Sequence, residues 1–320
     1  MTRRGLTAAC AGMAGIGLAA ISLPVMPAET EGAAILGLRP GYGPASVSTP
    51  PNQAAITKRI WMPGLDDGYN AQGLAVAGGS ILVSAYRSDS PDIHRGPCRA
   101  FRVDPANGSA TGQVDVPLPC GHAGGIAVAG NGRLYVADTH TLFAADLAGI
   151  FDGAARFRVI PLGPGVIGGL AISGADAIWL GSYREDGPGR LYRFTTAMLD
   201  RLPEGMALNA SDAAAQIAIP SHAQGAAIDA AGRLWVARSD LRWGELDRLD
   251  PATGKVEREY KAPPGIEGIA FAADGRLWAV SEAGARHQPR VGSFADQRPC
   301  DRSVPRNTLK TRLAGEPAPY

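Results

Sequence analysis

The sequence predicts an all-β fold, a β-propeller built as a ring of four-stranded sheets, and three observations lead to this prediction. A pattern of two short apolar runs joined by a turn recurs five times between residues 72 and 280. Successive copies begin 43 to 56 residues apart, which leaves room for four short strands in each. Turn residues are also abundant, with 42 Gly and 25 Pro, as many short strands require.

Each copy begins with a variable residue and then Gly, an apolar residue, Ala and an apolar residue. A turn and a second apolar run follow, and this second run is aromatic at its centre in four copies. The clearest copy is residues 266–284, IEGIAFAADGRLWAVSEAG, where the turn at Asp274 and Gly275 suits a hairpin. The first runs lie at 72–76, 124–128, 168–172, 224–228 and 267–271, and the second at 81–83, 134–136, 178–180, 234–236 and 277–279.

The third and fourth strands of a blade are visible in most copies, at 99–104 and 113–118, 191–195 and 215–219, and 245–250 and 255–260. The Gly of the first run suits a crowded strand next to the ring axis. The Trp or Tyr of the second run would fill the space between neighbouring blades. We therefore expect five four-stranded blades, with six as the alternative if residues 31–35 begin a degenerate one.

The ends of the chain differ from this repeat. Residues 285–320 form an Arg/Pro-rich tail without a further copy, so the last blade would lack its outer strand. Residues 54–62 are an isolated apolar run after a loose leader at 29–53, and they could supply that strand and close the ring. The expected propeller therefore spans residues 54–284.

Residues 1–28 resemble a signal peptide. Arg3 and Arg4 precede an apolar stretch, Met26-Pro27-Ala28 offers a cleavage site, and the start is similar to a twin-arginine export signal. An uncleaved anchor helix is disfavoured because the stretch is short and contains Gly and Pro. We expect a secreted or periplasmic protein with no stable membrane insertion after cleavage.

The cysteines agree with export. Cys98 and Cys120 bracket two apolar runs separated by turn residues, so in an antiparallel pair they would face each other and form a disulfide. A metal site that also uses His94 and His122 is the rival, although the spacing matches no known metal motif. Cys10 lies in the signal segment, and Cys300 is left over.

Overall charge argues against some partners. The 320 residues carry a formal net charge of +1, so nucleic acid and anionic membranes are not expected partners. We expect a monomer that binds a small molecule at the mouth of its central channel.

Side-chain alternation predicts the site. The variable residue of the first run and the residue two before it should face the same way, because side chains alternate along a strand. This places six polar side chains on one rim: Asn70, Gln72, His122, His222, Gln224 and Glu267. The ends of the second strands add Tyr86, Thr139, Tyr183, Ser239 and Glu282, and next to them stand Arg87, Asp138 and Arg238.

These residue types suit acid–base or metal chemistry. His122 or His222 could act as base, and Glu267 and Glu282 as acid or as ligands of a divalent cation, Ca²⁺ or Mg²⁺. Arg87 or Arg238 could hold a carboxylate or phosphate. The other reading is that these groups hydrogen-bond blade loops and channel water. No G-x-S-x-G elbow is present.

The motifs GRLWVA, RLDPATGKV and IEGIAFAADGRLWAVSE resemble the propeller superfamily of SMP-30/gluconolactonase, streptogramin lyase and NHL-repeat proteins, over about residues 56–284. Residues 267–282 are also similar to part of the esterase-like phytases. The lactonase resemblance implies a divalent cation held just before the first-strand glycines, where only Glu267 is acidic here. The lyase resemblance implies a glutamate at the end of a second strand, where Glu282 matches.

Together these features predict an exported hydrolase or lyase that acts on a small polar or lactone-bearing substrate. The alternative is a non-catalytic propeller that uses the same rim to bind a ligand or a protein.

Overall fold

The structure is a computed structural model that describes residues 34–43, 49–89, 96–153, 155–240 and 242–286. The chain divides into two compact units, Met1–Ala33 and Ala34–Tyr320, and every described residue belongs to the second. The expected signal peptide with Cys10, the residue His94, and the C-terminal tail after Arg286 with Cys300 lie outside the described residues.

Four antiparallel sheets of four strands follow one another along the chain, and a two-stranded sheet comes last. Blade 1 contains β1 (Tyr69–Ala77), β2 (Ser80–Arg87), β3 (Cys98–Val103) and β4 (Ala110–Val116), and blade 2 contains β5 (Gly125–Val128), β6 (Arg133–Asp138), β7 (Thr141–Asp146) and β8 (Arg158–Pro161). Blade 3 contains β9 (Leu170–Ile172), β10 (Ala177–Gly181), β11 (Gly189–Thr195) and β12 (Ala215–Ile219). Blade 4 contains β13 (Ala223–Ile228), β14 (Leu234–Ser239), β15 (Gly244–Leu249) and β16 (Val256–Lys261), and blade 5 has β17 (Ile266–Phe271) and β18 (Leu277–Ser281).

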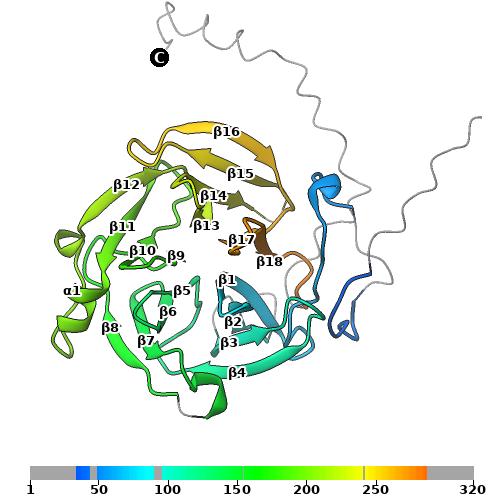
Figure 1. Cartoon of the computed structure of the whole chain (residues 1–320), viewed down its shortest axis with the longest axis horizontal. Helices are drawn as coiled ribbons and strands as arrows, with labels where there is room; N and C mark the ends of the chain where they lie inside the picture. Colours follow the sequence, from blue (N-terminus) through cyan, green and yellow to red (C-terminus); the bar gives the residue numbers. More distant parts are fainter. Residues whose placement is uncertain (1–33, 44–48, 90–95, 154, 241, 287–320) are drawn as a thin grey trace, which may run out of the picture. The chain divides into compact units, whose positions relative to one another are not determined.

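The first strand of each sheet lies at the centre and the fourth lies at the rim (Figure 1). Strand β1 contacts both β5 and β17, and β9 and β13 complete the circle between them. The five first strands therefore surround one axis, and the predicted β-propeller is confirmed.

The blade count differs from the prediction. Four blades have four strands, whereas the fifth repeat has only β17 and β18 among the described residues. The favoured count of five four-stranded blades was therefore wrong. Within the described chain there is no sixth repeat either, since Ala34 and Ile35 carry no strand.

Ring closure also differs from the prediction. Residues 54–62 form no strand: a 3-10 helix, η1 (Gln53–Ala55), is followed by extended chain with one parallel bridge between Leu36 and Ile60. The backbone N–H of Trp61 donates to Leu36 O, so this segment pairs with the leader instead of with β18. It contributes side chains only, because Ile60 and Met62 pack on the core that joins blades 5 and 1.

The glycine prediction is confirmed. A Cβ on Gly73 would overlap the backbone of Gly125 and Ile126 in the next blade, and one on Gly125 would overlap Leu170 and Ala171. Glycine is therefore needed where the first strands approach one another. Two further close approaches complete the series at the other side of the ring, Gly225 against Glu267 and Gly268 against Gly73.

The core is divided among the gaps between blades. Each of the five hydrophobic clusters joins residues of two successive blades, and the last joins blade 5 to blade 1. The second-strand aromatics lie in these gaps, as predicted: Tyr135 is buried between blades 2 and 3, and Trp235 contacts Phe271 of blade 5 with ring centroids 6.0 Å apart. Closure therefore rests on side-chain packing.

Helices are few and peripheral. The short helix α1 (Thr196–Arg201) begins at Thr195, whose Oγ1 accepts the N–H of Met198, and it buries Leu199 against blade 3. Two 3-10 turns, η2 (Ile150–Asp152) and η3 (Ala210–Asp212), lie in connections. Among the described residues, none of these helices has the length and apolar character needed to cross a bilayer.

The predicted disulfide between Cys98 and Cys120 is present, with 5.8 Å between the Cα atoms. The expected register was wrong, because Cys98 lies opposite Val116 and the chain turns back through Pro117 and Pro119 before it reaches Cys120. The bond therefore links the third strand of blade 1 to the loop that enters blade 2. Its two cysteines are buried.

Candidate functional site

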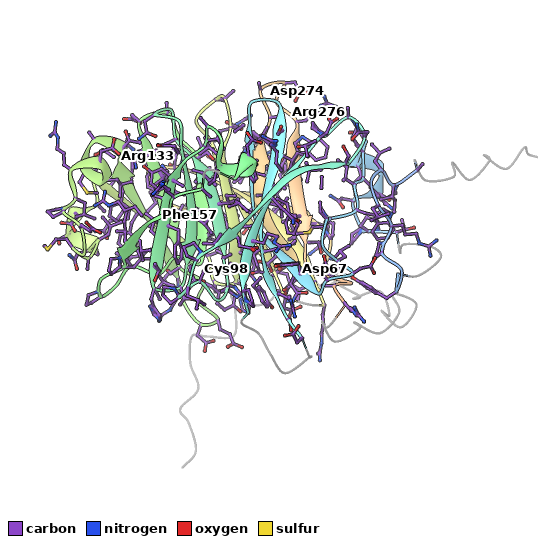
Figure 2. The ribbon with its side chains drawn as sticks, turned by 90° about the horizontal axis from the view of Figure 1, so that it is seen from below. Asp67, Cys98, Arg133, Phe157, Asp274 and Arg276 are labelled. Atoms are coloured by element: carbon purple, nitrogen blue, oxygen red, sulfur yellow. A yellow bond between two sulfur atoms is a disulfide. The ribbon has the colours of Figure 1, made fainter. Side chains whose placement is uncertain are left out.

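The predicted site residues share one end of the ring. Figure 2 shows Asp67, just before β1, and Cys98, at the start of β3, at the same end of the sheets. Arg133, Asp274 and Arg276, which lie in or beside turns between first and second strands, are at the opposite end. We call the first end the mouth, because there the first strands begin and the second strands end around the axis.

One rule describes how the mouth is built. The end of the second strand of each blade contacts the start of the first strand of the next blade. The five contacts are Tyr86 with His122, Thr139 with Gly168, Tyr183 with His222, Ser239 with Ile266, and Glu282 with Gln72. Each predicted second-strand end is therefore at a junction between blades.

The alternation behind the site prediction does not hold in detail. The register of β1 against β2 shifts between Ala71 and Gly73, so Gln72 is the extra residue of a β-bulge. The same shift occurs at Gln224 in β13, and β17 is irregular between Ile266 and Ile269. A bulge re-aims the side chain that it carries, so the mouth side chains follow the bulges and not a strict period of two.

Two carboxyl groups lie at the junction of blades 5 and 1. Glu267 is only 2% exposed, and burial, together with the neighbouring charge of Glu282, raises its pKa well above the usual value. Burial also raises the pKa of Glu282, to about 7, although a hydrogen bond from Gln72 opposes this change. Burial favours the protonated form of such groups because it removes the water that would solvate the charge.

Two amide side chains stand at the start of blade 1, and one of them reaches Glu282. Gln72 donates from Nε2 to Glu282 Oε2 at 3.2 Å and to the carbonyl of Ala71 at 3.0 Å. Asn70, two residues before, is buried, and its Oδ1 has no hydrogen-bond partner among the described residues. A buried oxygen without a donor is uncommon in folded proteins, so Asn70 offers an acceptor at this end of blade 1.

His122 is held from several sides. Its ring stacks on Tyr86, with centroids 5.2 Å apart and planes 26° apart. Asp138 Oδ1 accepts the backbone N–H groups of His122 at 2.7 Å and Ala123 at 3.0 Å, and the Cys120 disulfide anchors the same loop. Asp138 is therefore engaged by the backbone, and it positions His122 in the mouth.

His222 lies inside an aromatic cluster. Its ring makes edge contacts with Tyr183 at 5.9 Å and Trp243 at 5.6 Å between centroids. The backbone of His222 has a φ of 60°, a left-handed value that is unusual for a residue other than glycine and often marks a functional position. Gln224, two residues later, is half-buried.

The arginines at the mouth are already paired. Arg238 Nη1 lies 3.2 Å from Glu245 Oε2 and 3.1 Å from Asp247 Oδ2, and its Nε donates to the carbonyl of Ser221. Arg87 Nε lies 3.0 Å from Asp89 Oδ1. Ion pairs of this kind leave less positive charge for a carboxylate or phosphate ligand than the sequence alone suggested.

A metal ion could be held by few residues in the described chain. One group of potential ligands, Cys98 and Cys120 with Asp138, is already taken by the disulfide. A second group is Glu245, Asp247 and Glu259, but the positive charge of Arg238 already lies between the first two. Oxygen ligands suited to Ca²⁺ or Mg²⁺ are offered by Glu267 and Glu282, whose charges act on each other.

Two residues lie outside the site predicted from the sequence. They are Trp243, whose ring contacts His222, and Asp247, which is fully buried beside Arg238. Trp243 is set by the turn that Asp240 makes, since Asp240 Oδ1 accepts its backbone N–H at 3.0 Å. An Asp three residues before a Trp at the end of a strand is the sequence signal that could have identified it.

A cavity lies away from the mouth. It is an apolar depression between the outer parts of blades 3 and 4, with Trp179, Leu191 and Ile217 in its wall. None of the predicted site residues lines it. It holds no charged side chain to orient a polar ligand, so the chemistry argues for the mouth instead.

Comparisons with known proteins identify no family for this chain. No family model matches the sequence, and no curated protein matches it. The resemblance to the gluconolactonase and lyase superfamily therefore remains a prediction.

Several solved structures are similar in part. Hydrazine synthase of Kuenenia stuttgartiensis is 13% identical at a TM-score of 0.40, covering 66% of this chain and 55% of that one. Glutaminyl cyclase of Myxococcus xanthus is 16% identical with a TM-score of 0.42, and the match covers 67% of this chain and 86% of that one. The PQQ-bound aldose sugar dehydrogenase of Streptomyces coelicolor is 19% identical with a TM-score of 0.39, and the match covers 66% of this chain and 74% of that one. At such scores these likenesses carry no argument about activity, and the propeller assignment rests on the sheets themselves.

Proposed function

We propose that the mouth performs acid–base chemistry, and that the protein is an exported hydrolase or lyase acting on a small polar or lactone-bearing substrate. The observation that carries this proposal is the pair Glu267 and Glu282, two carboxyl groups that are buried together with raised pKa values. Pairs of titratable groups whose environments shift their pKa values are typical of catalytic acids and bases.

Gln72 gives the two carboxyl groups different roles. Its Nε2 donates to Glu282, and a donor stabilises the charged form of a carboxylate. Glu282, with a pKa of about 7, is partly ionised at neutral pH and serves as the base. Glu267 receives no such bond, remains protonated and serves as the acid.

These roles suffice for hydrolysis of a lactone. Glu282 takes a proton from water as the water oxygen attacks the carbonyl carbon. Glu267 donates a hydrogen bond to the carbonyl oxygen, where negative charge develops, and then a proton to the ring oxygen as the C–O bond breaks. The proton that Glu282 gained returns to Glu267 through solvent, so the enzyme is restored.

A lyase would use the same two groups. Glu282 would remove a proton from the carbon next to a carbonyl group, and Glu267 would protonate the leaving oxygen on the neighbouring carbon. The sequence alone does not choose between the two reactions, and a substrate panel does.

The histidines and arginines enter as supporting groups in this proposal. His122 and His222 were predicted as bases, and each ring now packs against a tyrosine at the mouth, where it can contact a bound substrate. Arg238, predicted to orient the substrate, is held by Glu245 and Asp247 and so supports the structure of the mouth. Tyr86 and Gln224 belong to the same rim and would contact the substrate.

A divalent cation is the main variant of the proposal. Glu267 and Glu282 could bind Ca²⁺ or Mg²⁺ in place of protons, because a cation would compensate the negative charges that burial disfavours. The cation would then polarise the carbonyl group of the substrate.

Export is part of the proposal. The buried disulfide between Cys98 and Cys120 is compatible with an oxidising compartment, and the expected signal segment would direct the chain to the periplasm or outside the cell. We also propose a monomer that binds neither nucleic acid nor membrane.

The test combines turnover with metal analysis. Purified mature protein should hydrolyse members of a panel of lactones and esters or eliminate from a lyase panel, with kcat/KM rising through a pKa near 7. E282Q should lose this limb of the pH profile, and E267Q should lose most of kcat. Metal analysis before and after EDTA separates the proton pair from the cation.

A non-catalytic binding propeller is the second candidate. It is favoured by the mouth residues that hold blades together, such as Ser239 with Ile266 O and Gln72 with Glu282. Absence of turnover across the panels, together with saturable binding of a ligand at the mouth, would support this candidate against the enzyme.

A further inference from the structure

An aromatic surface lines the mouth at the junction of blades 3 and 4. It is made of Tyr183, His222 and Trp243, with His222 between the other two rings. Tyr183 is 38% exposed, whereas the other two are half-buried. The faces and edges of these rings are therefore partly available to a ligand.

Negative charge surrounds this aromatic surface. After burial, the largest cause that raises the pKa of Tyr183 is the charge of Glu185, and Asp240 also contributes. Asp240 is fixed in position, because its Oδ1 accepts the backbone N–H groups of Arg242 and Trp243. Two carboxylates from separate parts of the chain therefore act on this surface, and Glu267 adds a third negative charge only when it is ionised.

The arginines beside this surface do not cancel its negative charge. Arg238 lies over Trp243, with 5.7 Å from Cζ to the ring centroid, but it is paired with Glu245 and Asp247. Arg184 and Arg242, next in sequence to Tyr183 and Trp243, are exposed and are not among the groups that act on Tyr183. An anionic ligand would therefore be repelled by the carboxylates of Glu185 and Asp240. A cationic ligand would meet both carboxylates and ring faces, which attract positive charge through their quadrupoles.

We propose that the surface formed by Tyr183, His222 and Trp243 binds a positively charged nitrogen, an amine or quaternary ammonium group. This inference deepens the proposed function, on which it rests, by naming a cationic group as the part of the substrate that the mouth recognises. The cation packs on the exposed aromatic rings, and Glu185 and Asp240 supply the compensating charge.

The experiment uses choline as the probe and 3,3-dimethylbutanol, its neutral isostere of the same shape, as the reference. Dissociation constants for both are measured by NMR titration of the full mature protein. Choline should bind at least several-fold more tightly than the alcohol, and the difference should shrink at high salt because exposed charges are screened. Equal binding of the two probes, or tighter binding of the alcohol, would overturn the proposal.

Variants locate the site. W243L should weaken choline binding by about fivefold, while W243F, which keeps an aromatic ring, should restore most of it. E185Q should weaken it by about two- to threefold. The matched control is D186N, which removes the neighbouring exposed carboxylate, one that is not among the groups acting on Tyr183. Equal effects of E185Q and D186N would contradict a local site.

The two proposals can fail separately. Turnover of neutral lactones with a pKa near 7, without discrimination between choline and its isostere, removes the cation site alone. Choline selectivity that depends on Trp243, without turnover on any substrate, removes the acid–base function and leaves a cation-binding propeller.

Discussion

Replacing Glu282 by Gln should stabilise the protein at alkaline pH. The folded protein raises the pKa of this carboxyl group from 4.5 to about 7, so it binds the proton more tightly than the unfolded chain does. Stability from this group is therefore complete below pH 4.5, falls as the pH rises to about 7, and stays low above that.

The magnitude follows from the size of this change. One pKa unit corresponds to about 1.4 kcal/mol, so ionisation of Glu282 lowers the free energy of unfolding by roughly 3 kcal/mol between pH 4.5 and 8. Gln has nearly the same shape, keeps an oxygen to accept the N–H of Gln72, and never ionises. E282Q should therefore match the wild type at pH 4.5 and exceed it by up to roughly 3 kcal/mol at pH 8.

The assay is urea unfolding followed by tryptophan fluorescence at pH 4.5, 6 and 8, with EDTA present so that no bound cation contributes. In a separate thermal scan at pH 8, the melting temperature of E282Q should exceed that of the wild type by about 6 to 12 °C for a protein of this size. E204Q, which changes an exposed carboxylate, is the control and should change stability little at any pH. If E282Q and wild type differed equally at pH 4.5 and 8, the buried-carboxyl explanation would be wrong.

Three further predictions concern the scaffold. G73A should cost about 1 to 3 kcal/mol in chemical unfolding, because its Cβ overlaps the next blade. G41A is the control, because a Cβ on Gly41 would meet no atom closer than 3.6 Å; it should cost less, and a reversed order would refute the close approach. D138A should lower the melting temperature and weaken the protection of the loop at His122 against hydrogen exchange. D138N keeps the accepting oxygen, so it should retain more of the stability and more of the protection. If D138A protected the loop as well as the wild type does, Asp138 would not hold this loop. Reduction of the bond between Cys98 and Cys120, which closes a 22-residue separation, should cost about 3 kcal/mol, and unchanged urea midpoints with and without reductant would count against it.

The repeat could be predicted because its signals are local. Turn residues such as Asp274 and Gly275 stand between two apolar runs, and the same arrangement recurs at a spacing that fits four strands. The crowding at Gly73 and the packing of Trp235 between blades also followed, since both depend only on position within the repeat.

The predicted rim residues lie together at one end of the ring, but the directions of their side chains differ from the prediction. Membership of the rim follows from the repeat, whereas the direction of each side chain depends on bulges at Gln72 and Gln224. A bulge is a change of register between two paired strands, so it cannot be identified from the sequence of one strand alone. The pairing of Arg238 with Asp247 was missed because the partner comes from the next strand of the sheet.

Ring closure shows the same limit. Residues 54–62 have the composition of a strand, yet the backbone of this segment hydrogen-bonds to Leu36 in the leader. Ile60 contributes only its side chain to the gap between blades 5 and 1. The segment could pair with the leader or with β18. The arrangement of all the blades decides between them, because pairing depends on tertiary packing more than on strand propensity.

The sequence by itself determined that this chain forms self-similar sheets, that glycines stand where the first strands approach, and that polar residues gather at one end. These properties depend on short-range periodicity, turn chemistry and side-chain size. Only the tertiary structure decided that Glu267 and Glu282 lie together in a buried junction, that tyrosines pack on both histidines, and that the arginines are neutralised. Those contacts join residues far apart in the chain, and their energies depend on burial, which exists only once the ring has closed.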